Sequence, residues 1–154
     1  MIKKFFLIIL LSLLFFNLSF AKNINVQENI NLSFKCKLEK KIIKNSEYSY
    51  KTFLAEELKD KDLDHFQIKA IKPKTLLIDG LSLFLSKSKK LNVKVVNKDV
   101  VLFKAIDAEK NYSESAIVTR KSGELIHEIT KNTKSKNSEK YIFFYSCKKR
   151  EKKV

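Results

Sequence analysis

The two cysteines of this 154-residue chain place the strongest limit on its fold, because each lies in a stretch with the pattern of a β-strand. Cys36 lies within 32–38, the first such stretch after the leader, and Cys147 ends the last one, 141–147. A disulfide needs its two Cα atoms within about 7 Å of each other. A bond between these cysteines would therefore bring the first and last strands together and close the chain on itself.

The first 21 residues have the features of a secretory signal peptide. Lys3 and Lys4 precede an uncharged apolar run over 5–16, and small residues stand at Ser19 and Ala21. This pattern predicts cleavage after Ala21 and a periplasmic or secreted mature protein. The alternative is an uncleaved anchor, but the run is shorter than the roughly 20 apolar residues that a spanning helix needs. We therefore expect no transmembrane segment in the mature chain.

Export favours pairing of the two cysteines, since thiols in an oxidising compartment form disulfides. The alternatives are two free buried thiols or a metal site. Two cysteines without a nearby histidine cannot complete a tetrahedral zinc site, so no metal and no cofactor is expected. The bridge would close a loop of more than a hundred residues, for which chain entropy predicts a stabilisation of about 4 to 5 kcal/mol.

The formal net charge of +15 indicates that anionic surfaces could attract this protein. However, the basic residues are 30 lysines and only two arginines, Arg120 and Arg150. Arginine is the usual choice where phosphate is gripped in a fixed bidentate geometry, and lysine-rich composition is typical of an AT-rich genome. We therefore expect most of the charge to be solvated surface, with no specific nucleic-acid partner.

Alternation of apolar and polar residues recurs along the chain, as at 32–38, 66–71 and 100–106. A period of two indicates half-buried strands, and the segment 55–65 favours one or two helical turns instead. The sequence predicts an all-β antiparallel barrel or sandwich of eight to ten strands with one short helical segment. This single domain occupies 22–147, between the signal peptide 1–21 and a basic tail, 148–154.

Two turns define expected hairpins. Asp79-Gly80 predicts a two-residue turn within the apolar segment Thr75–Leu85, which would be either covered on both faces or exposed as a contact surface. The second turn, Arg120-Lys121-Ser122-Gly123-Glu124, is interpreted as a three-residue loop, 121–123, with Gly123 in the left-handed conformation. That reading places Arg120 opposite Glu124, Val118 opposite Ile126 and Ile117 opposite His127.

The segment around Cys36, the turn 119–124 and the closing Tyr145-Ser146-Cys147 resemble features of small secreted β-proteins of AT-rich marine alphaproteobacteria. The resemblance implies the architecture and no activity. Ser122-Gly123 also resembles the short inhibitory loop of periplasmic inhibitors of lysozyme, which are small disulfide-closed β-barrels. Lys121 and Glu124 depart from the flanks of that loop.

No catalytic motif is present: the chain has no Gly-x-Ser-x-Gly elbow, no His-Glu-x-x-His and no glycine-rich phosphate loop. Its two histidines are His65, in an acidic segment, and His127, on an apolar face. We expect a noncatalytic protein that binds a small apolar or anionic molecule in the barrel interior or at its basic mouth. The candidate ligand-binding residues are His127, Tyr141, Phe143 and Tyr145.

The alternative function is that of a protein–protein interaction, inhibitor or envelope-structural protein. Its contact would be the loop of Arg120, Lys121, Ser122 and Gly123, together with the apolar segment Thr75–Leu85. An open cavity lined by the four candidate residues would favour the binding protein. A pairing of His127 with a carboxylate inside a cavity would favour an enzyme.

Overall fold

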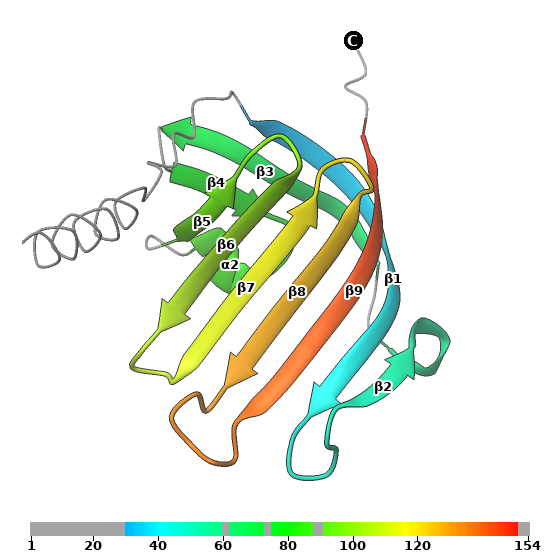
Figure 1. Cartoon of the computed structure of the whole chain (residues 1–154), viewed down its shortest axis with the longest axis vertical. Helices are drawn as coiled ribbons and strands as arrows, with labels where there is room; N and C mark the ends of the chain where they lie inside the picture. The colour runs from blue at the N-terminus through cyan, green and yellow to red at the C-terminus, as the bar shows by residue number, and fades with distance from the viewer. Residues whose placement is uncertain (1–29, 60–61, 73–74, 88–90, 151–154) are drawn as a thin grey trace, which may run out of the picture.

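The computed structural model describes residues 30–59, 62–72, 75–87 and 91–150, and the predicted signal peptide lies outside these ranges. Nine strands form one antiparallel sheet, accompanied by a short α-helix and a 3₁₀ turn (Figure 1). In chain order these elements are β1 (Asn31–Lys44), β2 (Lys51–Leu54), η2 (Ala55–Glu57), β3 (Leu63–Lys72), β4 (Thr75–Asp79), α2 (Leu83–Lys87), β5 (Asn92–Val96), β6 (Val100–Asp107), β7 (Tyr112–Thr119), β8 (Glu124–Lys131) and β9 (Glu139–Lys149).

The hydrogen-bonded order of the sheet is β4-β3-β1-β9-β8-β7-β6-β5, and β2 adds to β1 beside this path. The sheet curls into a half-barrel (Figure 1), which confirms the all-β antiparallel prediction and its range of eight to ten strands. It is a single curled sheet, so the sandwich alternative is not the one adopted. Within the described ranges, no helix has the length and apolar character that a membrane crossing would require.

The predicted disulfide is present and joins the first strand to the last. Cys36 of β1 lies directly opposite Cys147 of β9, with their Cα atoms 4.0 Å apart and an S–S distance of 2.05 Å. Both cysteines are buried. Beyond the bridge, β9 continues through Lys149, and the Arg150 N–H donates to the Ser33 carbonyl, so part of the expected basic tail belongs to the sheet.

The two ends of the long strands differ in how they are buried. At the disulfide end, here called the closed end, buried and exposed residues alternate along β1 from Phe34 to Glu39, and Phe34 and Phe66 are fully buried. At the other end, here called the open end (residues 40–44, 51–54, 128–131 and 139–144), most side chains are half-buried on both faces. Figure 1 shows why: β3 and β4 lie behind the upper part of the sheet, while the lower parts of β1, β8 and β9 extend beyond them.

A bulge in β1 marks the boundary between the two ends. The register between β1 and β9 shifts between Leu38 and Lys40, and β3 pairs with β1 only as far as Cys36 and Leu63. The Asp62 carboxylate accepts a hydrogen bond from the backbone N–H of Leu38 at 2.8 Å. This contact satisfies the Leu38 N–H at a point where β3 no longer runs beside β1. β2 then takes the place of β3 beside residues 40–43 of β1.

The bulge also changes which residues of β1 face the concave side of the half-barrel. Cys36 and Leu38 face inward before the bulge, and Lys41, opposite Phe143, faces inward after it. A bulge inserts one residue and so exchanges the two faces of a strand beyond it. One extra residue therefore brings a lysine onto the concave face, where the alternation alone would not place it.

The expected hairpin at Asp79-Gly80 is wrong in its second half. β4 ends at Asp79 and Gly80 has a positive φ of 79°, but the chain then enters α2 instead of a returning strand. The Ser82 hydroxyl accepts a hydrogen bond from the N–H of Leu85, as an N-cap does, and an N-cap at this position favours helix over strand. The apolar residues of this segment are largely covered, namely Leu76, Ile78, Leu81 and Leu85, whereas Leu77 and Leu83 remain exposed.

The expected register after the second turn is also wrong, by one residue. Val118 pairs with Leu125 rather than Ile126, and His127 pairs with Ala116 rather than Ile117. The turn spans four residues, and the N–H of Gly123 donates to the Thr119 carbonyl at 2.9 Å. Gly123 has a positive φ of 75°, as expected, and its carbonyl accepts from Cys147 N–H at 2.7 Å, so contact with β9 decides the loop length.

The acidic segment 55–65 contains less helix than expected. The 3₁₀ turn η2 covers only Ala55–Glu57, and the Glu57 carboxylate accepts from the N–H of Leu54 at 2.6 Å. β3 begins at Leu63, so His65 lies on a strand. Pairing with β1 therefore overrides the local helical propensity of the second half of this segment.

Candidate binding surface

Aromatic rings and lysines meet on the concave face of the open end. The Lys41 ammonium lies 4.6 Å from the ring centre of Phe143 and 5.4 Å from that of Tyr141. On the far side of β9, the Lys131 ammonium lies 5.2 Å from the Tyr141 ring. Ammonium groups at these distances are attracted by the electron-rich ring faces, so the rings hold the two lysines over the sheet.

The predicted ligand-binding residues lie together on this side of the sheet. His127 stacks on Phe143 with ring centres 5.8 Å apart, and Phe143 stacks on Tyr145 at 6.3 Å. Tyr141 is on the same face of β9, two residues from Phe143. His127 and Tyr145 are buried, whereas Tyr141 and Phe143 are partly exposed. The ladder of rings thus passes from the interior of the closed end to the accessible surface of the open end.

Residues of β2 extend this surface, and sequence reasoning did not find them. Phe53 pairs with Lys41 and Lys51 pairs with Ile43, which places both side chains on the concave side. The Lys51 ammonium lies 5.0 Å from the ring centres of both Tyr48 and Phe53. The alternation of Lys51 and Phe53 in the sequence was an available signal, but their partners depend on β2 replacing β3. We call Lys41, Lys51, Phe53, Lys131, Tyr141 and Phe143 the aromatic–lysine surface.

One carboxylate lies within this surface. Glu139 pairs with Lys131 and accepts a hydrogen bond from the Tyr141 hydroxyl at 2.8 Å. This hydrogen bond is the main reason that the pKa of Tyr141 is raised, with smaller contributions from burial and from the charge of Glu139. The surface therefore offers hydroxyl and carboxylate groups beside its lysines, rather than positive charge alone.

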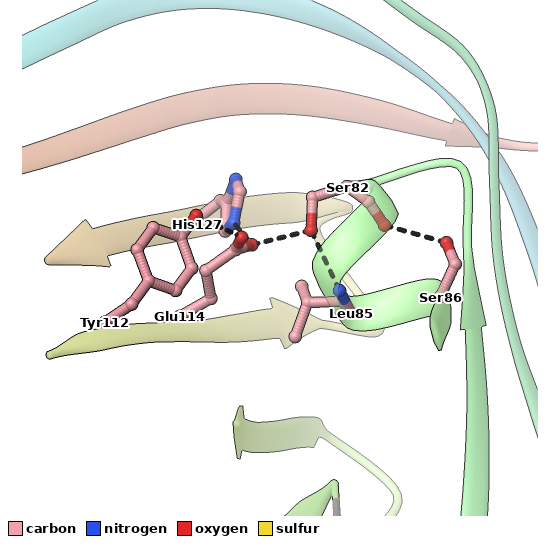
Figure 2. A network of polar contacts seen from close by, with 6 residues as sticks. All are labelled: Ser82, Leu85, Ser86, Tyr112, Glu114 and His127. Atoms are coloured by element: carbon pink, nitrogen blue, oxygen red, sulfur yellow. Dashed lines mark hydrogen bonds and ion pairs between the residues drawn. The ribbon is translucent and has the colours of Figure 1, made fainter. Parts of the chain in front are cut away.

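A buried polar network bounds the surface on the β7 side (Figure 2). The carboxylate of Glu114 accepts hydrogen bonds from Tyr112 Oη at 2.5 Å and Ser82 Oγ at 2.8 Å, and its Oε2 lies 2.8 Å from His127 Nε2. Burial acts to raise the pKa of Glu114, but these three hydrogen bonds outweigh it, so the pKa is lowered. Burial, followed by the hydrogen bond to Glu114, raises the pKa of Tyr112.

This network places α2 against the sheet. Ser82 donates to Glu114 with the same hydroxyl that caps α2, and Phe84 packs edge-on against Tyr112 with ring centres 4.9 Å apart. The Ser82 and Tyr112 hydroxyls and the His127 ring all converge on one carboxylate, and that carboxylate and His127 are buried. Such an arrangement holds α2 in the curl of the sheet.

The predicted interaction loop lies at the closed end, away from the aromatic–lysine surface. Arg120 donates to the Asn97 carbonyl through Nη1 at 2.8 Å, and its backbone N–H donates to the Asp99 carbonyl at 2.7 Å. Gly123 is buried against β9, while Lys121 and Ser122 are exposed. The two sets of predicted residues therefore cannot form one site.

The outward face of the open end carries a matched counterpart to the concave surface. Lys40 pairs with Phe144, and its ammonium lies 4.7 Å from the Phe144 ring centre. Lys40–Phe144 and Lys41–Phe143 are thus adjacent lysine–ring pairs on opposite faces of the same two strands. Further apolar residues continue the outward side across neighbouring strands in paired positions, namely Leu102, Ile117 and Ile126.

Two clefts, of about 410 and 280 Å³, lie on the outward side of β1. The larger is lined by Lys35, Lys37 and Lys148 together with Glu39 and Asp62, so its charges are mixed. The residues described contain no group of three or more His, Cys, Asp or Glu side chains placed to hold a metal ion.

Comparisons with family models, curated proteins and solved structures found no significant match to this chain.

Proposed function

We propose that this is a noncatalytic binding protein of the periplasm or the secreted fraction, and that it takes an anionic ligand on the aromatic–lysine surface. The observation that carries the proposal is the placement of Lys41 and Lys131 over the Tyr141 and Phe143 rings on a partly exposed concave face. A buried disulfide is typical of an oxidising, extracytoplasmic compartment, which supports export. The signal peptide predicted at 1–21 would direct that export.

The chemistry of the surface supports binding. The exposed parts of the rings supply apolar area for the body of a ligand, and ammonium groups supply attraction for its acidic group. An anion bound against Lys41 and Lys131 would pair with charges that the fold already directs toward one place.

Native mass spectrometry of the protein purified from its own host under nonreducing conditions tests this proposal. We expect a mature mass beginning at Lys22 that gains two hydrogens on reduction, plus a ligand mass that is lost on denaturation. The ligand should be absent from the Phe143→Ala variant and retained by Phe144→Ala, the matched change on the outward face. Retention by both variants, or a bare protein in every sample, would contradict binding at this surface.

A second candidate function is protein–protein interaction through the outward face. It is favoured by the row of paired apolar residues that crosses β6, β7, β8 and β9, of which Ile126 is 36% exposed. The same experiment separates the two functions: a defined complex that Phe144→Ala disrupts and Phe143→Ala preserves would identify the outward row as the contact.

A further inference from the structure

The aromatic–lysine surface is extended rather than enclosed. It crosses β2, β1, β9 and β8, and three steps between neighbouring strands at about 4.8 Å each give a width of roughly 14 Å. Beyond β8, α2 covers the concave side of β7 through Ser82 and Phe84. The surface is thus bounded on one side by α2 and is longer than one sugar ring, with lysines at both ends.

From this arrangement we infer that the ligand is a segment of an acidic polysaccharide, built of sugar units that carry carboxylates. This inference rests on the proposed function and names its ligand class. Lysine ammonium groups already lie over the faces of Tyr141, Phe143 and Phe53, which belong to β9 and β2. The flat, apolar faces of sugar rings would pack on the parts of these rings that remain exposed. Lys51 at one side and Lys131 at the other would pair with carboxylates spaced along the chain.

The carboxylate of Glu139 favours a polysaccharide over a nucleic acid as the ligand. Glu139 accepts from the Tyr141 hydroxyl beside Lys131, in the accessible part of the surface. It would repel the continuous phosphate charge of a single-stranded nucleic acid, which binds through basic tracks interleaved with rings. A polysaccharide has hydroxyl groups that can donate to Glu139 and to Tyr141 between its more widely spaced charges.

The filled interior argues against a fatty acid as the ligand. An acyl chain would need an enclosed apolar cavity to leave water. The interior beside the ring ladder is occupied by Leu38, Leu125 and Phe103, each at most 1% exposed, and Leu38 and Leu125 pair with Tyr145 from either side. The accessible part of the ladder is a surface on which a chain molecule can lie.

Isothermal titration of the purified protein with a polyuronate hexasaccharide, the matching disaccharide and oligothymidylate tests the inference. We expect the hexasaccharide to bind more tightly than the disaccharide, and oligothymidylate to bind more weakly than either. Phe143→Ala and Lys131→Gln should each weaken hexasaccharide binding about tenfold or more, which corresponds to about 1.4 kcal/mol. Phe144→Ala and Lys40→Gln should change it less than about twofold.

The outcomes distinguish this inference from the function on which it rests. Equal binding of oligothymidylate would overturn the polysaccharide class in favour of any polyanion. Failure of every saccharide, while a ligand from the host still depends on Phe143, would overturn the class and leave the binding function standing. Because Lys131 is exposed, Lys131→Gln should fold normally, so loss of saccharide affinity in that variant cannot be attributed to unfolding.

Discussion

The closed end and the open end are made from the same strands, yet they use their side chains differently. At the closed end, one face of each strand fills a core around Phe34 and Phe66, and the disulfide ties the first strand to the last. At the open end, β3 has left and both faces of the sheet remain partly exposed. The difference indicates that the closed end carries most of the stability, so that the open end can expose the aromatic–lysine surface at which we propose binding.

The largest effect is expected for removal of the disulfide. Replacing both Cys36 and Cys147 with serine should lower the free energy of unfolding by about 4 to 5 kcal/mol, because the bridge closes a loop with a sequence separation of 111. Urea unfolding of the double variant beside the oxidised wild type measures the loss. A change below about 1 kcal/mol would show that strand pairing alone holds the closed end together.

Alanine substitutions of two phenylalanines compare the ends directly. Phe34→Ala removes a fully buried ring at the closed end and should destabilise the protein by about 3 to 5 kcal/mol. Phe143→Ala removes a partly exposed ring and should cost about 1 to 2 kcal/mol. Chemical denaturation of both variants provides the comparison. Equal losses would contradict the assignment of stability to the closed end.

The turn that meets the disulfide should be sensitive to a single methyl group. A Cβ added to Gly123 would lie 2.0 Å from the carbonyl oxygen of Cys147, at a residue whose φ is already +75°. Gly123→Ala should therefore cost about 1 to 3 kcal/mol. Lys121→Ala, in the exposed part of the same loop, is the control and should stay within about 0.5 kcal/mol. Thermal melts of the two variants would contradict this account if they coincided.

The smallest effect concerns pH. Because the pKa of Glu114 is lower in the folded protein than in the unfolded chain, the folded state binds this proton less readily. The stabilisation is present above the ordinary glutamic acid value of about 4.3 and is lost as the pH falls through the lowered pKa. In Glu114→Gln, this acid-range dependence should be weaker, with Tyr112, Ser82 and His127 still facing position 114. Unfolding curves between neutral and acid pH measure it, and identical slopes would exclude Glu114 as the source.

The features that the sequence predicted correctly depend on the period of a β-strand or on the pairing of cysteines expected outside the cytoplasm. Alternation located most strands, and export predicted the pairing of Cys36 with Cys147. The ring ladder could be predicted for the same reason, since Tyr141, Phe143 and Tyr145 share one face of a regular strand. Each of these follows from the period of a strand or from the number of cysteines.

The features that the sequence did not predict depend on contacts between distant segments. α2 forms where a strand was expected because the Ser82 hydroxyl donates a hydrogen bond to Glu114, which is 32 positions away. Lys41 reaches the concave face only because the bulge after Leu38 exchanges the faces of β1. The register at Gly123 follows from its contact with β9 rather than from the turn sequence.

Amide chemical shifts of the ¹⁵N-labelled protein, recorded while a polyuronate hexasaccharide is added, give the central test. The account predicts that the perturbed amides cluster at 41–43, 51–53, 129–131 and 139–143, on the strands that carry the aromatic–lysine surface. Amides of the loop 120–123 and of the closed-end core should not move. Perturbations centred on that loop, or on the outward row at Leu102, Ile117 and Ile126, would contradict the assignment of binding to the concave face of the open end.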